Sequence, residues 1–309
     1  MDRQADFDDA IPETSLYDED EADRAEFLAP SPVDPLYALA EHQKPEADTA
    51  TWVEAFCAAT RVKMLEELLP CAVVTGAYRR LLIAASAAEA TRMSRPCSPD
   101  ALTQALVFTH EKTSPGVSLG LEIFASRTKA LVRPGAGETW QDRLLSIWPE
   151  FDVDVLQGSP LDQIQGLYEE VARTRSSQAG ESTAVDSESI GLAQILDLNR
   201  PLMIETRNCL DMNEDPASAL HRHSIEAESV LRRLGQLWAF LPSPLRNGTD
   251  PVVRRVAIMA IEEPGLSVPT AATTLVVSKP AVRHAIAELC EHGFLHEMTR
   301  RGSWRYWRA

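Results

Sequence analysis

Apolar residues return every three or four positions along most of the chain from Thr51 onward, and this periodicity constrains the fold more than any other feature of the sequence. Between 51 and 70 the spacing is kept by Trp52, Phe56, Ala59, Val62, Leu65 and Leu69. Side chains spaced in this way lie on one face of an α-helix. Similar segments follow at about 72–93, 99–112, 117–132, 138–149 and 159–176. The chain is therefore predicted to be mainly α-helical.

Charge and composition divide the 309 residues into three predicted parts. Residues 1–50 contain fifteen Asp or Glu against three Lys or Arg, which gives −12 of the formal net charge of −16. They are predicted to form an acidic, largely flexible tail. A helical domain is predicted over 51–240, with an internal linker near 175–189, where small and polar residues predominate. A small domain is predicted over 250–309, after a proline-rich boundary segment.

The acidic tail has two interpretations. It could compete with DNA for a basic surface, because the two ends of the sequence carry opposite charge. It could also be a solvated segment that keeps the protein soluble. We favour the second interpretation.

The sequence gives little support for catalysis. The phosphate-binding pattern G-x-x-x-x-G-K-[ST], the dinucleotide-binding pattern G-x-G-x-x-G and the zinc-protease pattern H-E-x-x-H are absent. No apolar run reaches the roughly 18 residues of a membrane span, and no secretory signal is evident. The five scattered cysteines lack a C-x-x-C pair, which is typical of reduced thiols. We expect a cytoplasmic protein that is not an enzyme, has no cofactor and does not associate with a membrane.

Three short helices and a hairpin are predicted within the last 60 residues. The first helix starts at Pro251, the second covers 270–275 and the third follows Ser278. Two strands, 294–299 and 304–308, are predicted to flank a turn that contains two arginines. The predicted fold class is therefore mainly α, with a C-terminal β-hairpin.

The third of these helices has a predicted buried face and a predicted exposed face. Ser278 is its expected N-cap, Pro280 fits the first turn because no N–H is needed there, and Gly293 ends the helix. The buried stripe consists of Val282, Ala285, Ile286 and Leu289. The side chains expected to lie wholly or partly outward are Lys279, Ala281, Arg283, His284 and Ala287.

Residues 276–307 resemble winged helix-turn-helix modules. In such modules Ser-(Arg/Lys)-Pro opens the recognition helix, and Leu-x-x-x-Gly-(Ile/Leu/Phe)-(Leu/Ile) closes it before the hairpin, or wing. The matching residues are Ser278-Lys279-Pro280 and Leu289-Cys290-Glu291-His292-Gly293-Phe294-Leu295. The segment is similar to the modules of bacterial MarR-type regulators and of many Fic-family proteins, and more weakly to rhizobial plasmid helix-turn-helix proteins. The Fic catalytic loop, His-Pro-Phe-x-x-Gly-Asn-Gly-Arg, is absent.

Binding to double-stranded DNA requires donors on the exposed first half of the recognition helix and cations beside it. The residues expected at base edges are Lys279, Arg283 and His284. Those expected to donate to phosphates are Ser278 and Thr270. The wing residues expected at the backbone or in the minor groove are Arg300 and Arg301. The sequence therefore favours a transcriptional regulator, acting as a homodimer because one module contacts too few base pairs for useful specificity.

The alternative is a protein–protein adaptor whose winged helix binds no nucleic acid. The net charge of 250–309 is only about +2, and Ala281 and Ala287 stand where polar readers of DNA could be. A fold does not by itself fix a function. An enzyme hidden in the helical domain is the least supported class.

Several basic pairs outside the recognition helix and the wing are predicted to be ordinary surface residues. The arginine pairs Arg79-Arg80, Arg232-Arg233 and Arg254-Arg255 are interpreted as solvated helix faces, with the last pair able to approach phosphate. His221 and His223 form an H-x-H pair without a visible third metal ligand, so they too are expected at the surface.

Overall fold

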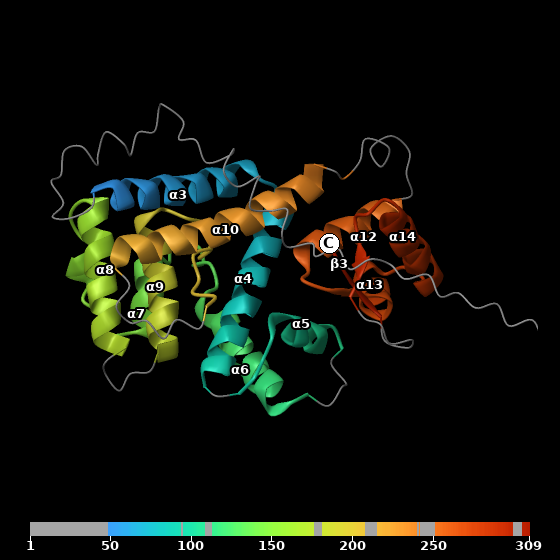
Figure 1. Cartoon of the computed structure of the whole chain (residues 1–309), viewed down its shortest axis with the longest axis horizontal. Helices are drawn as coiled ribbons and strands as arrows, with labels where there is room; N and C mark the ends of the chain where they lie inside the picture. The colour runs from blue at the N-terminus through green and yellow to red at the C-terminus, as the bar shows by residue number, and fades with distance from the viewer. Residues whose placement is uncertain are drawn as a thin grey trace, which may run out of the picture.

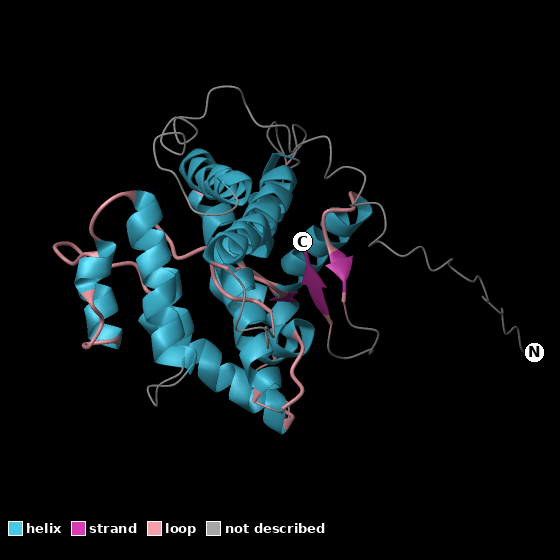
Figure 2. Cartoon of the chain, turned by 60° about the vertical axis from the view of Figure 1, so that its left-hand side comes forward, coloured by secondary structure: helices cyan, strands magenta, loops and turns pink. Residues whose placement is uncertain are grey.

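The described part of the chain is built mainly from α-helices. The computed structural model describes residues 49–93, 95–108, 113–175, 181–207, 215–239, 241, 251–298 and 305–309. Within these residues the only sheet has three short strands close to the C-terminus (Figure 2). The predicted fold class is confirmed. The predicted acidic tail lies outside the described residues, except that its last two residues start the first described helix.

Two long helices, α3 (Thr49–Leu68) and α10 (Pro216–Ala239), lie side by side although they are far apart in sequence (Figure 1). Arg61 of α3 donates a hydrogen bond to Glu228 of α10 over 2.9 Å, and Arg232 donates to the same carboxylate over 2.7 Å. The pairing of these helices therefore combines apolar packing with a shared carboxylate.

Helix α4 (Cys71–Arg92) crosses the middle of the molecule and packs against α5 (Pro99–Val107), α6 (Pro115–Ala130) and α10 (Figure 1). It is the one described helix with the length and apolar composition of a membrane span, and 67% of its apolar window is buried inside the protein. Within this structure α4 serves as a core helix, which explains why it is apolar on more than one side.

Helices α7 (Trp140–Ile147), α8 (Pro160–Arg175) and α9 (Glu181–Ile195) gather at one end, with a short 3-10 helix over Val153–Leu156. The predicted linker at 175–189 is wrong from residue 181 onward, because these residues belong to α9. Asp186 accepts a hydrogen bond over 3.1 Å from Arg127 of α6, which also pairs with Glu89 of α4. Burial raises the pKa of Asp186 to about 6. Polar residues can be ordered in a core when distant partners satisfy them, and composition alone does not reveal those partners.

The residues 251–298 and 305–309, which we call the C-terminal unit, lie at the other end of the molecule (Figure 1). Their helices are α12 (Pro251–Glu262), α13 (Val268–Leu275) and α14 (Lys279–Glu291). Their strands are β1 (Leu266–Ser267), β2 (His296–Glu297) and β3 (Tyr306–Arg308), which form an antiparallel sheet in the order β1-β3-β2. Strand β1 was not predicted, because two residues show no periodicity.

The C-terminal unit meets the helical body where α12 ends against α4. A Cβ atom added at Gly76 of α4 would lie 2.0 Å from the carbonyl oxygen of Ile261, so only glycine permits this approach. Arg80, one turn further along α4, donates to the carbonyls of Ile261 at 2.7 Å and of Ala260 and Glu263 at 3.1 Å. The carbonyls at a helix end lack intrahelical partners and carry partial negative charge, so a guanidinium stabilises them.

The sequence predicted that the arginine pair at 79–80 is a solvated helix face. That prediction is wrong, because both residues belong to this contact. Arg79 forms an ion pair with Glu263, just beyond α12. Burial and the nearby charge of Arg308 lower the pKa of Arg80 to about 9, which still leaves its guanidinium protonated at neutral pH. Arg79 and Arg80 thus hold the end of α12.

Helix α5 makes a second contact with the C-terminal unit. The rings of Phe108 and Tyr306 pack edge to face with centroids 6.1 Å apart, and Arg308 pairs with Asp100 at 3.2 Å. The apolar core also runs without interruption from the helical body into the C-terminal unit. The two predicted domains are therefore joined by a shared core.

We predict that Gly76→Ala lowers the free energy of unfolding by about 1–3 kcal/mol, because the new methyl group meets a backbone carbonyl that cannot rotate away. Helix propensity alone would favour alanine by about 1 kcal/mol. A decrease in the free energy of unfolding would therefore show the effect of the contact rather than of helix propensity. Urea unfolding measures it. The control is Gly135→Ala, where a Cβ meets no atom within 4 Å and the change should stay within about 0.5 kcal/mol. A stabilised Gly76→Ala variant would contradict the contact.

Candidate nucleic-acid interface

Helices α13 and α14 are joined by a tight turn of only three residues, 276–278, and they pack against each other. Ser267 caps α13 by accepting a hydrogen bond from the Thr270 amide, and Ser278 caps α14 by accepting one from the Ala281 amide, each over 3.3 Å. The predicted N-cap of α14 is confirmed, and α13 begins two residues earlier than predicted because Ser267 starts it.

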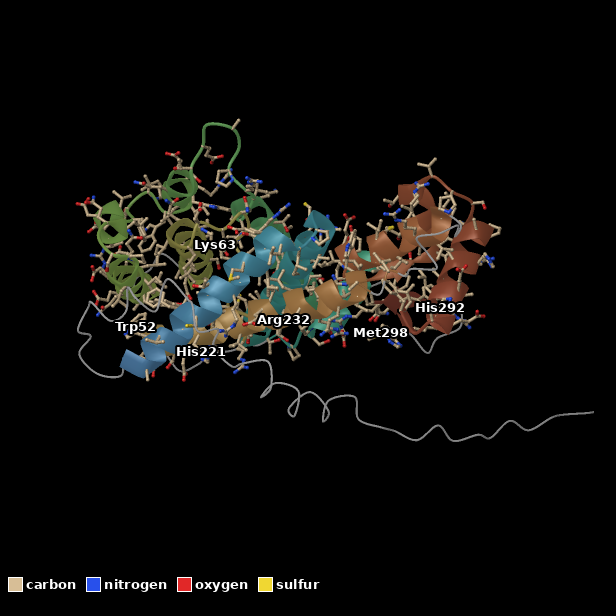
Figure 3. The ribbon with its side chains drawn as sticks, turned by 90° about the horizontal axis from the view of Figure 1, so that it is seen from above. Trp52, Lys63, His221, Arg232, His292 and Met298 are labelled. Carbon is tan, nitrogen blue, oxygen red and sulfur yellow. The ribbon has the colours of Figure 1, made fainter. Side chains whose placement is uncertain are left out.

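One face of α14 is buried and the other is exposed, as the sequence predicted. The buried residues are Val282, Ala285, Ile286 and Leu289. They face the body side, since α12 lies between α4 and α14 (Figure 1). His292, just beyond α14, lies at the opposite end of the molecule from Trp52 of α3 (Figure 3). The exposed face of α14 therefore lies at an extremity of the described structure.

The structure brings five of the seven predicted site residues to this extremity. All five are exposed, and they are Thr270, Ser278, Lys279, Arg283 and His284. Lys279 and Arg283 are one turn apart, so they lie on the same side of α14. The other two, Arg300 and Arg301, lie outside the described residues.

The two cations on α14 are available to a ligand. No described residue accepts a hydrogen bond from Lys279 or Arg283, and neither forms an ion pair with a described residue. The Ser278 hydroxyl accepts a bond in capping α14, which leaves its proton free to be donated. The Thr270 hydroxyl lies 2.8 Å from that of Ser267, so it is already hydrogen-bonded. Thr270 is thus the weaker of the two hydroxyl candidates.

Two other arginines of the C-terminal unit are engaged within the protein. Arg255 donates to the carbonyl of Leu275 at the end of α13, and Arg305 pairs with Glu297 over 3.4 Å. Arg254 is exposed on α12. Glu288 and Glu291 stand on the second half of α14, so positive charge is confined to the first half. A polyanion would be attracted there and repelled further along the helix.

Val276 is the strained point of the turn. Its φ of 54° and ψ of 50° are left-handed, a conformation that β-branched residues rarely adopt, and its side chain is 88% exposed. Nothing in the sequence indicated this conformation, because glycine or asparagine would be expected at such a position. An apolar side chain thus projects into solvent beside the start of α14.

One hydrolase-like pattern is present in α6, since Gly116-Val117-Ser118-Leu119-Gly120 matches G-x-S-x-G. In hydrolases that serine stands on a sharp turn between a strand and a helix. Here Ser118 lies within α6, its amide donates to the Ser114 carbonyl over 2.9 Å, and its hydroxyl lies 2.7 Å from that of Thr113. A Cβ at Gly116 would lie 2.2 Å from the Pro96 carbonyl oxygen. Close packing explains this glycine without catalysis.

His223 of the H-x-H pair is buried, and Cys290 of α14 is partly buried. His223 was predicted at the surface, but it is buried and faces two glutamates. The described residues contain no group of three or more His, Cys, Asp or Glu side chains placed to hold a metal ion. Burial, with a smaller effect from Glu297, raises the pKa of the Cys290 thiol, which disfavours the reactive thiolate.

No protein-family model matches the chain, and no curated protein matches it. Its function must therefore be inferred from the geometry of the C-terminal unit.

We predict that Val276→Gly raises the free energy of unfolding by roughly 1 kcal/mol, because the left-handed conformation costs glycine almost nothing. Thermal or urea unfolding measures the change. Val277→Gly is the matched control: its backbone is not left-handed, so the substitution should destabilise the protein. Equal losses of stability in both variants would show that the turn is not strained at Val276.

Proposed function

We propose that the C-terminal unit is a winged helix-turn-helix through which the protein binds double-stranded DNA as a transcriptional regulator. One observation carries the proposal: Lys279 and Arg283 lie one turn apart on the exposed face of α14, and no described residue pairs with either. One face of the unit is buried against the body, and the two unpaired cations lie on the opposite face. Exposed cations of this kind attract an anionic partner.

The order of elements supports the winged-helix assignment. The unit runs helix, strand, helix, three-residue turn, helix and then two antiparallel strands. In such an arrangement the last helix enters the major groove, which is wide enough to admit an α-helix. The loop between β2 and β3 would be the wing, and it contains Arg300 and Arg301, which we place at the backbone or in the minor groove.

Each exposed residue of α14 has a role suited to its chemistry. Arg283 can donate two hydrogen bonds to O6 and N7 of guanine, the commonest base-specific contact. Lys279, in the first turn of α14, can reach a base edge or a phosphate. His284, the residue after Arg283, would also approach a base edge. Ser278 can donate its proton to a phosphate at the point where α14 begins. Thr270 of α13 would donate to a phosphate of the DNA backbone.

Specificity requires more than one such unit. One unit contacts a few base pairs, whereas dimeric helix-turn-helix proteins read two half-sites separated by one helical turn of DNA or a multiple of it. We therefore propose that the protein binds as a homodimer. Because α12 is held on α4 through Gly76 and Arg80, the spacing of the two half-sites would be set by contacts of the helical body rather than by a flexible joint.

A protein–protein adaptor is the second candidate, and the exposed Val276 favours it. An exposed apolar side chain in a strained turn just before α14 would suit a protein partner as well as a thymine methyl group. Salt separates the two functions. DNA affinity falls steeply with salt because bound counterions are released, whereas an apolar protein interface responds little.

We predict that Lys279→Ala/Arg283→Ala weakens binding to a mixed-sequence DNA duplex by at least about 30-fold at low salt, equivalent to about 2 kcal/mol for the two lost contacts. Each phosphate contact removed should also reduce the slope of log affinity against log salt by about 0.9. Fluorescence anisotropy with a labelled duplex measures both.

The matched control is Lys129→Ala/Arg133→Ala, which removes the same charge from exposed residues at and after the end of α6. This variant should bind DNA as the parent does, apart from a small loss at low salt. If both double variants lose affinity equally, binding is a property of overall charge and α14 is not the interface. If the parent binds no duplex at low salt, the adaptor function takes its place.

A further inference from the structure

A buried polar cluster lies between α8, α9 and α10, far from the proposed DNA interface. His223 of α10 is at its centre, with a side chain that is only 1% exposed. Its Nδ1 atom lies 3.1 Å from Oε1 of Glu188 on α9. Its Nε2 atom lies 3.3 Å from Oε2 of Glu205, in the segment that follows α9. Both ring nitrogens therefore face carboxylate oxygens that come from different parts of the chain.

Two more groups complete the surroundings of His223. Arg222, the preceding residue of α10, donates to both oxygens of Glu205 over 2.8 and 3.1 Å. The Tyr168 hydroxyl of α8 lies 3.5 Å from His223 Nδ1. The titratable and charged groups that face the histidine are thus Tyr168, Glu188, Glu205 and Arg222. Two carboxylates are balanced by one guanidinium only if the imidazole carries the second positive charge.

The contacts of the two ring nitrogens favour the same protonation state. A neutral imidazole has one N–H donor and one acceptor nitrogen, whereas an imidazolium has two donors. Nε2 is hydrogen-bonded to Glu205, whereas Nδ1 lies at ion-pair distance from Glu188 Oε1 without hydrogen-bond geometry. A neutral ring protonated at Nε2 would therefore direct its Nδ1 lone pair toward the Glu188 carboxylate. A buried carboxylate without its partner is strongly unfavourable. His223 is therefore best matched to its site when both nitrogens are protonated.

We propose that His223 is a buried imidazolium that fastens α9 and the segment 201–207 to α10, and that loss of its proton at raised pH loosens this end of the molecule. The segment held by Glu205 carries Leu202, Met203 and Ile204, which are almost fully buried. Weakening the ion pairs would remove the polar anchor that keeps these apolar residues in the core. The inference is independent of DNA binding.

The electrostatic shifts agree with this geometry. Burial lowers the pKa of His223, but the charges of Glu188 and Glu205 outweigh it, so that the pKa lies above the ordinary 6.5. Burial likewise opposes the ionisation of Glu205, yet bonds from His223 and Arg222 bring its pKa down to about 2. The pKa of Tyr168 is raised well above 10 by burial and by Glu188, so the tyrosine does not titrate in the same range as the histidine.

The sign of the pH dependence follows from the raised pKa. Below pH 6.5 both the folded and the unfolded chain hold the proton, and the histidine contributes its full stabilisation. Between 6.5 and the folded-state pKa only the folded chain holds it, so stability falls as pH rises. The contribution is lost once pH exceeds the folded-state pKa. One proton can lower the folding equilibrium constant by at most tenfold for each pH unit in this window.

The test is an NMR titration of the full-length protein, followed at the His223 imidazole and at the Met203 methyl group, together with urea unfolding at several pH values. We expect His223 to titrate above pH 6.5 and the Met203 signal to move with the same midpoint. In His223→Gln, the fall in stability above pH 6.5 should be smaller by up to tenfold in equilibrium constant per pH unit, and the Met203 signal should no longer move. The control is His221→Gln, a partly exposed residue of the same helix (Figure 3), which should keep the parent's behaviour.

Three results would overturn the proposal. The first is titration of His223 at or below pH 6.5. The second is a stability difference between the parent and His223→Gln that is the same at pH 6 and at pH 9. The third is a Met203 signal that does not follow the titration of His223. If His223→Gln fails to fold, the titration of the intact protein and the Met203 signal still decide the question.

Discussion

The approach of α12 to α4 is the contact on which the rest of the described structure depends. Gly76 lets the two helices come together where a Cβ would meet the Ile261 carbonyl, and Arg80 satisfies three carbonyls at the end of α12. The guanidinium replaces the water that would otherwise solvate this helix end. Because α12 lies between α4 and α14, the same contact determines where the exposed face of α14 points.

Buried charge holds the other end of the molecule. Arg127 joins α6 to α4 and α9, and His223 joins α10 to α9 and to the segment after it. Buried ion pairs add little net stability over apolar packing, but removing one partner leaves an unpaired charge and is strongly destabilising. Such clusters therefore restrict how these helices can pack.

Local patterns in the sequence predicted local structure well. The periodicity from Thr51 onward indicated the helices, and the cap at Ser278 with the stripe from Val282 to Leu289 gave α14 and its exposed face. Features that depend on distant partners could not be predicted. Residues 181–189 resemble a linker in the sequence, because their partners Arg127 and His223 are distant along the chain. Arg80 resembles a solvated residue for the same reason, since the carbonyls that it binds belong to the end of α12. Strand β1 exists only through its pairing with β3, and the conformation of Val276 contradicts its residue type.

The most direct test of DNA recognition by α14 is to sequence the genomic DNA fragments that the intact protein retains at two salt concentrations. If α14 recognises DNA, the retained fragments should share a short sequence motif, and fewer fragments should be retained at the higher salt concentration. The motif should be absent from the fragments that the Lys279→Ala/Arg283→Ala variant retains. Retention of the same fragments by the parent and the variant, or of none by either, would contradict the assignment of this face to DNA.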